Sequence, residues 1–222
     1  MSLLGSGVLV NYHNVAPGSH EEFEAWHTHE HVPERVGVPG FLRGRRYRAL
    51  LQGQPEYYIL YETRDPAVLG SAAYHARLDD PTPWTSKMSA KMTYTGRNAG
   101  QVMLSSGDAG IGGAAITLAN AQEPLVENGA VNGTLRALLD GLLDRWGITA
   151  AHLFENDTGI SRLNTSEARI RQAQGEDGFD RWIVVVEGLD ATRVDATRDA
   201  LATLFDDAHR VPTYQLQMVL SR

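Results

Sequence analysis

Hydrophobic residues along the chain form short alternating or β-branched runs, separated by stretches in which they recur at helical spacing. Runs of the first kind predict β-strands, because alternate side chains of a strand point to opposite faces of a sheet. In the first half these runs are rich in valine, isoleucine and tyrosine, which suit a pleated surface. The predicted strands of this half are residues 7–15, 41–50, 56–63 and 93–104.

Two helices are predicted between these strands. Ser19–Glu22 has the spacing of a capping box and predicts the start of a helix that ends near Pro33. Asp65, followed by proline, predicts the start of a second helix that runs to about Asp79. The proline-rich segment 81–84 is expected to be a loop leading to the last strand.

The same order of elements recurs after the glycine-rich stretch 105–113, which we interpret as a linker. Leucines at helical spacing predict a helix over residues 134–146, and a second helix is expected to begin near Thr192. A polar insert at 155–178 has no clear periodicity and is expected to be a solvated hairpin or a lid. The predicted strands of this half are residues 114–119, 149–154, 181–187 and 214–220.

Each half therefore has the order β-α-β-β-α-β, which is that of a ferredoxin-like unit. Helices cover one face of such a sheet, but runs such as 7–12 and 182–186 are apolar on both faces, so the second face must also be buried. We predict an α+β fold in which two tandem ferredoxin-like units, 1–106 and 107–222, pack sheet against sheet. The result would be a pseudo-dimer within one chain.

The composition narrows the classes of function. The formal net charge is −7, whereas nucleic-acid-binding proteins usually carry a basic surface. The absence of cysteine excludes disulfides, thiolate catalysis and zinc sites built on cysteine. The N-terminal segment does not resemble a signal peptide, and no apolar run is long enough to span a membrane. We expect a cytoplasmic protein that binds neither nucleic acid nor membrane.

The first predicted helix carries polar residues on the face that should be buried. At about 100° per residue, His31 lies at the edge of that face and His29 lies opposite. Burying a carboxylate and imidazoles costs free energy unless they are paired, and such a cost is often found at a functional site. The residues within one third of the helix circumference are Phe23, Trp26, His27 and Glu30.

Three interpretations of these residues stay open. His31 or His27 can serve as a general acid or base, with Glu30 orienting the imidazole or raising its basicity. His27 and His31 also have the spacing of a metal-binding pair, but no strong third ligand is apparent in the sequence. In the third interpretation the residues only satisfy helix ends and packing contacts, with Glu30 paired to an arginine such as Arg45.

Aromatic and polar residues elsewhere in this half are candidates for a ligand pocket. Tyr12 and His13 are expected on opposite faces of the first strand, and Tyr61 on the same face of the third strand as Tyr57. A pocket between helix and sheet would suit a flat, apolar, partly oxygenated molecule. The residues expected to bind it are Tyr12, His13, Trp26, Arg45, Tyr61 and Trp84.

Several of these residues together resemble a known family. Over about residues 7–105 the chain is similar to the dimeric α/β-barrel superfamily, in particular its EthD-like members. The second half matches only in the order of its elements. The resemblance implies two ferredoxin-like units that form a barrel, normally between two chains and here within one. The motifs that carry it are Phe23-x-x-Trp26, Glu30-His31-x-Pro33-Glu34-Arg35, Val38-Pro39-Gly40-Phe41, Arg45-Arg46-Tyr47 and Pro81-Thr82-Pro83-Trp84.

The resemblance also implies a range of activities. Members include polyketide cyclases, lactone isomerases, cofactor-independent monooxygenases and haem-binding enzymes, and the haem signatures are not found here. In several members a histidine and tyrosines in the cleft between helix and sheet transfer protons. The motif places His31 in that role, with Glu30 beside it.

We therefore expect a cyclase, isomerase or monooxygenase-like enzyme that acts on a small aromatic or polyketide-like molecule. No metal or other cofactor is expected. The alternative is a small-ligand-binding or stress-related protein with the same fold and no catalytic activity. The fused unit could also pair with a second copy into a homo-oligomer.

Overall fold

The computed structural model describes residues 3–222 except 53–54, 120–124, 128, 174 and 203–211. Its main sheet contains eight strands, each at or within a few residues of a run that predicts it. The strands are β1 Gly7–Val15, β2 Phe41–Ala49, β3 Tyr57–Thr63, β4 Met92–Ser106, β5 Ala114–Ala119, β8 Ile148–Asn156, β9 Trp182–Gly188 and β10 Thr213–Ser221.

These strands close into a barrel in the order β1-β3-β2-β10-β5-β9-β8-β4, and every neighbouring pair is antiparallel. The first half contributes β4-β1-β3-β2 and the second contributes β10-β5-β9-β8. One seam between the halves pairs β2 with β10, and the other pairs β4 with β8. The chain therefore has an α+β fold built on a closed antiparallel barrel.

Alternate side chains of the strands point into the barrel and out toward the helices. In β1, Val8 and Tyr12 belong to the core inside the barrel, whereas Leu9 belongs to the core under the first-half helices. In β3, Tyr58 points inward and Tyr61 points outward. The period-two pattern of the sequence therefore separates two cores on the two faces of one sheet.

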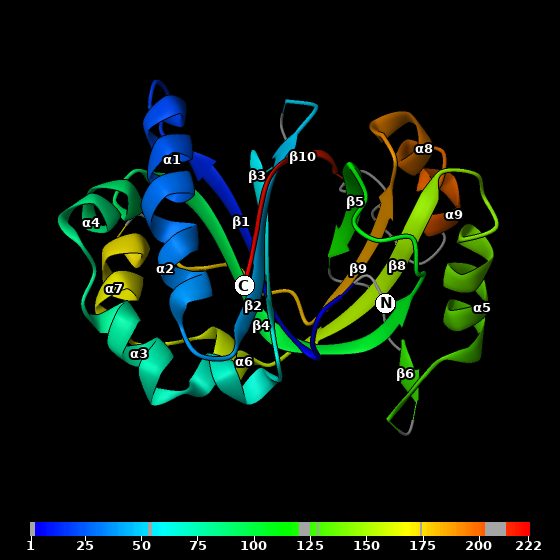
Figure 1. Ribbon diagram of the computed structural model, residues 1–222, viewed down its shortest axis with the longest axis horizontal. Coiled ribbons are helices and arrows are strands. Elements are labelled where there is room, and N and C mark those ends of the chain that lie inside the picture. Colours follow the sequence, from blue (N-terminus) through cyan, green and yellow to red (C-terminus); the bar gives the residue numbers. More distant parts are fainter. Residues whose placement is uncertain (1–2, 53–54, 120–124, 128, 174, 203–211) are drawn as a thin grey trace.

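Helices cover the barrel on two opposite sides (Figure 1). No helix in the described ranges is long and apolar enough to cross a membrane. The first half contains α1 His20–Trp26, the π-helical turn η1 His27–His31, α2 Val32–Gly37, the 3₁₀ helix η2 Pro66–Gly70, α3 Ala72–Asp79 and α4 Pro83–Ser89. The second half contains the hairpin β6 Val126–Glu127 and β7 Ala130–Val131, then α5 Gly133–Leu142, α6 Thr158–Ser161, α7 Ser166–Gln172, α8 Ala191–Asp195 and α9 Arg198–Ala202.

The helix that carries the histidines continues past its predicted end. It runs through α1, η1 and α2 to Gly37, because a π turn precedes Pro33 and the Val32 N–H donates to the carbonyl of His27. A π turn holds one extra residue, and it relieves the clash that a proline ring makes with the carbonyl four residues earlier in an α-helix. The predicted capping box is not formed, since the Ser19 side chain makes no capping hydrogen bond.

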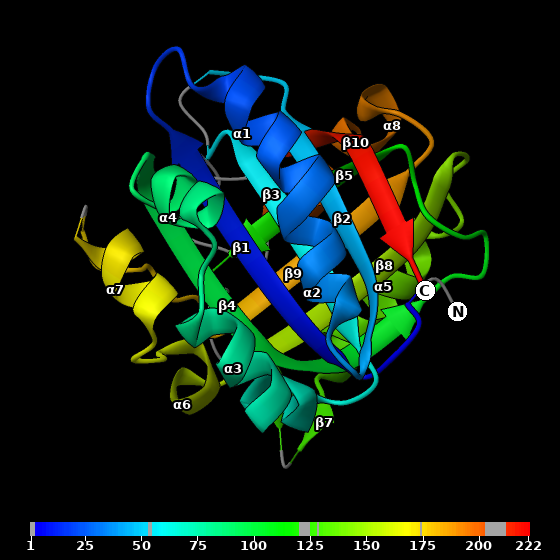
Figure 2. The ribbon, with the colours of Figure 1, turned by 60° about the vertical axis from the view of Figure 1, so that its left-hand side comes forward.

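Two segments expected to be irregular contain helices. In the proline-rich segment, the Thr82 hydroxyl accepts a hydrogen bond from the Thr85 N–H and caps α4, with Pro83 as its first residue. The polar insert contains α6 and α7 in place of a solvated hairpin. These helices leave their own half: α7 packs against α3 and α4, and α6 packs against β4. Figure 2 shows α7 and α6, in yellow, beside the teal α3 and α4.

Candidate functional site

A small cavity lies on the outer face of the sheet, where β1, β3 and β4 face α2, α3 and α7. Its volume is about 30 Å³, which leaves room for ordered water but is far below the several hundred Å³ of an ordinary ligand pocket. Residues of both halves meet there. The charged and titratable residues that line it are His13, His31, Arg35, Tyr61, Tyr74, Arg97, Glu167 and Arg171.

Two of the predicted imidazoles reach this cavity and a third lies behind them. His31 and His13 line the cavity, while His27 is buried between the rings of Phe23 and His31, with centroids 5.5 Å from each. The ring of Trp26 lies 4.4 Å from that of His31. In the part of the chain that the structure describes, the Nδ1 atoms of all three histidines lack a hydrogen-bond partner.

Burial keeps these imidazoles neutral. Loss of solvent, helped by the nearby charge of Arg171, lowers the pKa of His13 to about 3. Burial also lowers the pKa of His27 and of His31 well below the ordinary value, with a further contribution from Arg46 to His27 and from Arg35 to His31. A neutral imidazole has one ring nitrogen that accepts a proton, so His13 and His31 are free to accept one from a molecule in the cavity, and the lowered pKa makes each a weaker base than a solvated imidazole.

Glu30 is hydrogen-bonded to residues at the start of α4. Its Oε1 accepts hydrogen bonds from the hydroxyls of Thr82 (2.5 Å) and Thr85 (3.0 Å). The Thr85 oxygen in turn accepts the Nε1–H of Trp26 at 3.1 Å. The carboxylate therefore ties the first helix to α4, and the pairing of Glu30 with Arg45 considered from the sequence is not formed.

Arg45 lies inside the barrel, on the opposite face of the sheet from the cavity. Its Nη1 lies 2.8 Å from Glu187 Oε1, and its Nη2 lies 2.8 Å from Glu62 Oε1, with all three side chains fully buried. Burial alone would raise the pKa of Glu187, but Arg45 and His152 outweigh it and lower this pKa to about 2. Arg45 therefore links β2 and β3 of the first half to β9 of the second. It does not reach His13, His27 or His31 on the other face of the sheet.

The predicted aromatic residues divide between the two faces. Tyr61 lines the cavity, and burial raises the pKa of its hydroxyl, so this group remains a protonated donor. Trp26 is buried beside the histidines, and Trp84 packs against the same outer core without lining the cavity. Tyr12 lies inside the barrel, stacked on Tyr58 with ring centroids 5.6 Å apart. The structure thus brings together His31, His13 and Tyr61, with Trp26 behind them.

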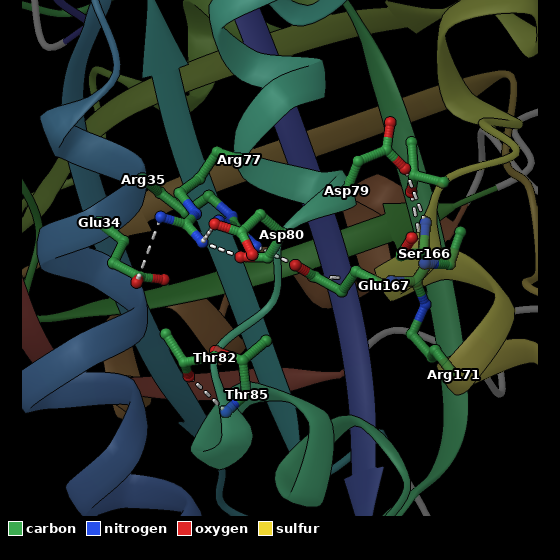
Figure 3. A network of polar contacts seen from close by, with 12 residues as sticks. Glu34, Arg35, Arg77, Asp79, Asp80, Thr82, Thr85, Ser166, Glu167 and Arg171 are labelled. Carbon is green, nitrogen blue, oxygen red and sulfur yellow. Dashed lines mark hydrogen bonds and ion pairs between the residues drawn. The ribbon is translucent and has the colours of Figure 1, made fainter.

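Four charged residues of the cavity were not among the candidates from the sequence. Arg35 belongs to the family motif and donates to Glu167, which raises the pKa of Arg35 although burial acts in the opposite direction. Arg97 donates to two backbone carbonyls at the end of α6 (2.6 and 2.8 Å). Arg171 pairs with Asp177 at 2.6 and 2.9 Å. Figure 3 shows Glu167 and Arg171 on α7, with Glu167 directed toward Arg35. For Glu167 and Arg171, the signal available in the sequence was the presence of charged residues in the polar insert 155–178.

Several solved structures are similar to this chain in fold, whereas no family model and no curated protein sequence matches it. A provisionally assigned monooxygenase of Fusobacterium nucleatum superposes with a TM-score of 0.59 at 10% identity, covering 99% of this chain and 96% of that one. An anthrone oxidase-like protein gives 0.59 at 13% identity, covering 97% and 93%. A provisionally assigned chlorite dismutase gives 0.54 at 10% identity, covering 97% and 96%.

The chain has the dimeric α/β-barrel fold. This is the fold that the resemblance of the sequence motifs implies. At identities this low the likeness extends to architecture, because one fold supports many reactions. The chemistry must be argued from the cavity itself.

The cavity does not fit a haem, the group used by some members of the superfamily. A volume of about 30 Å³ is far too small for a porphyrin. A larger hollow of about 420 Å³ lies between β4 and Trp182 of the second half, but none of its described lining residues is a histidine. Within the described ranges, no group of three or more histidine, aspartate or glutamate side chains could hold a metal ion.

Proposed function

We propose that this chain is an EthD-like, cofactor-independent enzyme of the monooxygenase type. Its substrate is a small aromatic or polyketide-like molecule, for which the cavity of about 30 Å³ must enlarge on binding, and His31 is the base. The observation that carries the proposal is a pair of buried, neutral imidazoles, His31 and His13, which face one cavity with unpartnered Nδ1 atoms. The monooxygenase and anthrone oxidase-like proteins that share the fold support this choice of reaction.

The reaction begins with removal of a proton from a CH₂ carbon that a carbonyl group makes acidic, either directly or through the aromatic rings as in anthrone. His31 takes this proton, and the substrate becomes an enolate. The Tyr61 hydroxyl, which remains protonated, and the guanidinium of Arg35 stabilise the negative charge on oxygen. Dioxygen is the oxidant: one of its atoms becomes the new carbonyl oxygen, and the other leaves as water with the two hydrogens of the CH₂ group.

Glu30 has a positioning role in this proposal. Its hydrogen bonds to Thr82 and Thr85 fix α4 against the first helix and hold Trp26 through Thr85. The ring of Trp26 then packs against His31 and limits how that imidazole can turn.

We also propose that the chain arose as two fused ferredoxin-like units, the first carrying the site and the second completing the barrel. The strand orders support this, because β4-β1-β3-β2 and β10-β5-β9-β8 are the same order when the strands of each half are numbered along the chain. The second half has a leucine-rich helix, α5, where the first has its histidines. The cover formed by α6 and α7 also comes from the second half.

The test is oxygen consumption with anthrone as the substrate. We expect wild-type protein to convert it to the anthraquinone and the His31→Gln variant to lose at least about 100-fold in kcat/KM, the usual effect of removing a general base. His29→Gln is the matched control, because His29 lies on the same helix but is exposed to solvent. Equal rates for wild type and His31→Gln, or no conversion by wild type, would contradict the proposal.

A further inference from the structure

The charges around the cavity are unbalanced. Its lining holds three guanidinium groups, those of Arg35, Arg97 and Arg171, against one carboxylate, that of Glu167. Asp177 lies outside the lining and pairs with Arg171. Both imidazoles of the lining are neutral, so they do not change the balance. In a space that holds little water, a positive excess of this kind attracts an anion strongly.

Arg35 keeps a donor that nothing in the described part of the chain uses. The residue is 2% exposed; its Nη2 donates to Glu167, while its Nη1 has no hydrogen-bond partner there. Arg97 is instead bonded to backbone carbonyls of α6, and Arg171 to Asp177. A guanidinium normally binds a carboxylate through two parallel N–H bonds, and Glu167 uses only one nitrogen of Arg35.

Glu167 reaches Arg35 from the other half of the chain, 132 positions away (Figure 3). It lies on α7, a helix of seven residues seated against α3 and α4. Beside it, the Ser166 N–H donates to Asp79 Oδ1 at 2.9 Å. None of the strand pairs that close the barrel includes α7, so this helix can move away from Arg35 without breaking the barrel.

We infer that Arg35 anchors an anionic group of the substrate, either a carboxylate or an ionised phenol or enol. Glu167 occupies this anchor when no substrate is bound. The incoming anion replaces Glu167 at Nη2 of Arg35 and also accepts a hydrogen bond from the unused Nη1, and α7 moves outward to enlarge the cavity of about 30 Å³. The inference rests on the proposed function, because it names the class of substrate for the same site.

Calorimetric titration of the full chain with benzoate tests the competition between Glu167 and the anion. Glu167→Gln removes the competing charge, and we expect it to bind benzoate about tenfold more tightly than wild type. Glu176→Gln is the matched control, since it removes the same charge from an exposed position of the same insert. Equal affinity for wild type and Glu167→Gln would overturn the inference. So would an equal gain in affinity for benzyl alcohol, which has no charge.

A second variant tests the anchor itself. Arg35→Gln combined with Glu167→Gln removes both charges of the pair, so no unpaired buried ion is left to prevent folding. We expect this double variant to lose the benzoate affinity that Glu167→Gln alone gains, and retention of that affinity would overturn the inference.

The His31→Gln variant separates the inference from the proposed function. It should still bind benzoate as wild type does, even though it loses turnover. If His31→Gln loses turnover but no protein in the series binds benzoate, the base assignment stands and the anion site is refuted. If benzoate binds normally but His31→Gln keeps its turnover, the anion site stands and the base assignment is refuted.

Discussion

The imidazole of His31 stacks on that of His27, with ring centroids 5.5 Å apart and ring planes inclined by 30°. Both rings are buried, and Arg35, Arg46 and Arg171 add positive charge around them. A proton on either ring would lose its hydration and repel its neighbours, so the folded protein holds both rings neutral. The unfolded chain has no such restriction.

This difference makes stability depend on pH. The histidines titrate near 6.5 when unfolded and well below that when folded, so the unfolded state binds more protons as the pH falls and unfolding becomes easier. Between about pH 6.5 and about pH 5, wild type should lose about 2 kcal/mol more stability than His27→Gln. Urea unfolding at the two pH values measures this. His29→Gln, at an exposed position, should behave as wild type, and equal losses in all three proteins would contradict the prediction.

The same lowered pKa predicts the pH dependence of turnover. A base whose pKa is below the ordinary value of 6.5 remains unprotonated in mildly acidic solution. We expect kcat/KM for anthrone to stay level from about pH 8 to about pH 6.5 and to fall only at lower pH. A fall centred at or above pH 6.5 would mean that a solvated group, and not His31, is the base.

Thr85 should matter for stability through Trp26. Thr85→Val removes the hydroxyl that accepts the Nε1–H of Trp26 and donates to Glu30, which leaves buried polar groups without partners. A loss of about 1–3 kcal/mol in the free energy of unfolding is expected. Thr85→Ser keeps the hydroxyl and should lose less. Denaturant unfolding measures both variants, and equal free energies of unfolding for Thr85→Val and Thr85→Ser would contradict the prediction.

Arg45 should matter for the barrel. Arg45→Met leaves Glu187 and Glu62 buried with fewer positive partners, and removing one member of a buried ion pair costs about 3–5 kcal/mol. Arg48→Met, on the same strand, removes a solvent-exposed pair with Glu24 and should cost less than about 1 kcal/mol. Thermal and urea unfolding of the two variants gives the comparison. Similar costs would show that the interior ion pairs do not hold the two halves together.

The positions of the strands could be predicted from the sequence because they depend on local pattern. The alternation in β3 directs Tyr58 into the barrel and Tyr61 out of it. The sequence alone predicts that these two tyrosines lie on opposite faces of the sheet. The opposite orientations of Tyr12 and His13 follow from the same rule. Cover on the second face also follows, because these strands are apolar on both faces, whereas the seams that close the barrel, β2 with β10 and β4 with β8, do not follow from the pattern.

The polar contacts of the site could not be predicted in the same way. The bond between Arg35 and Glu167 joins residues 132 positions apart, and it depends on where the insert folds. Glu30 was placed on the buried face by counting at 100° per residue, a count that the π turn at 27–31 breaks. The capping hydroxyl of Thr82 was visible in the sequence, but two neighbouring prolines favoured a loop there.

The π turn holds one residue more than a turn of α-helix. Deleting a single residue from it would restore regular α-helical geometry, and the change would be confined mainly to the turn itself, because a π turn absorbs its extra residue locally. His27 and His31 would then be three residues apart, and their stacked arrangement beside the cavity would change while α2, with Arg35, kept its place. The length of this segment therefore matters more for the site than the identity of its exposed residue: we expect a substitution of His29 to leave the cavity as it is, whereas the loss of one residue from the turn changes which imidazole it directs at the cavity.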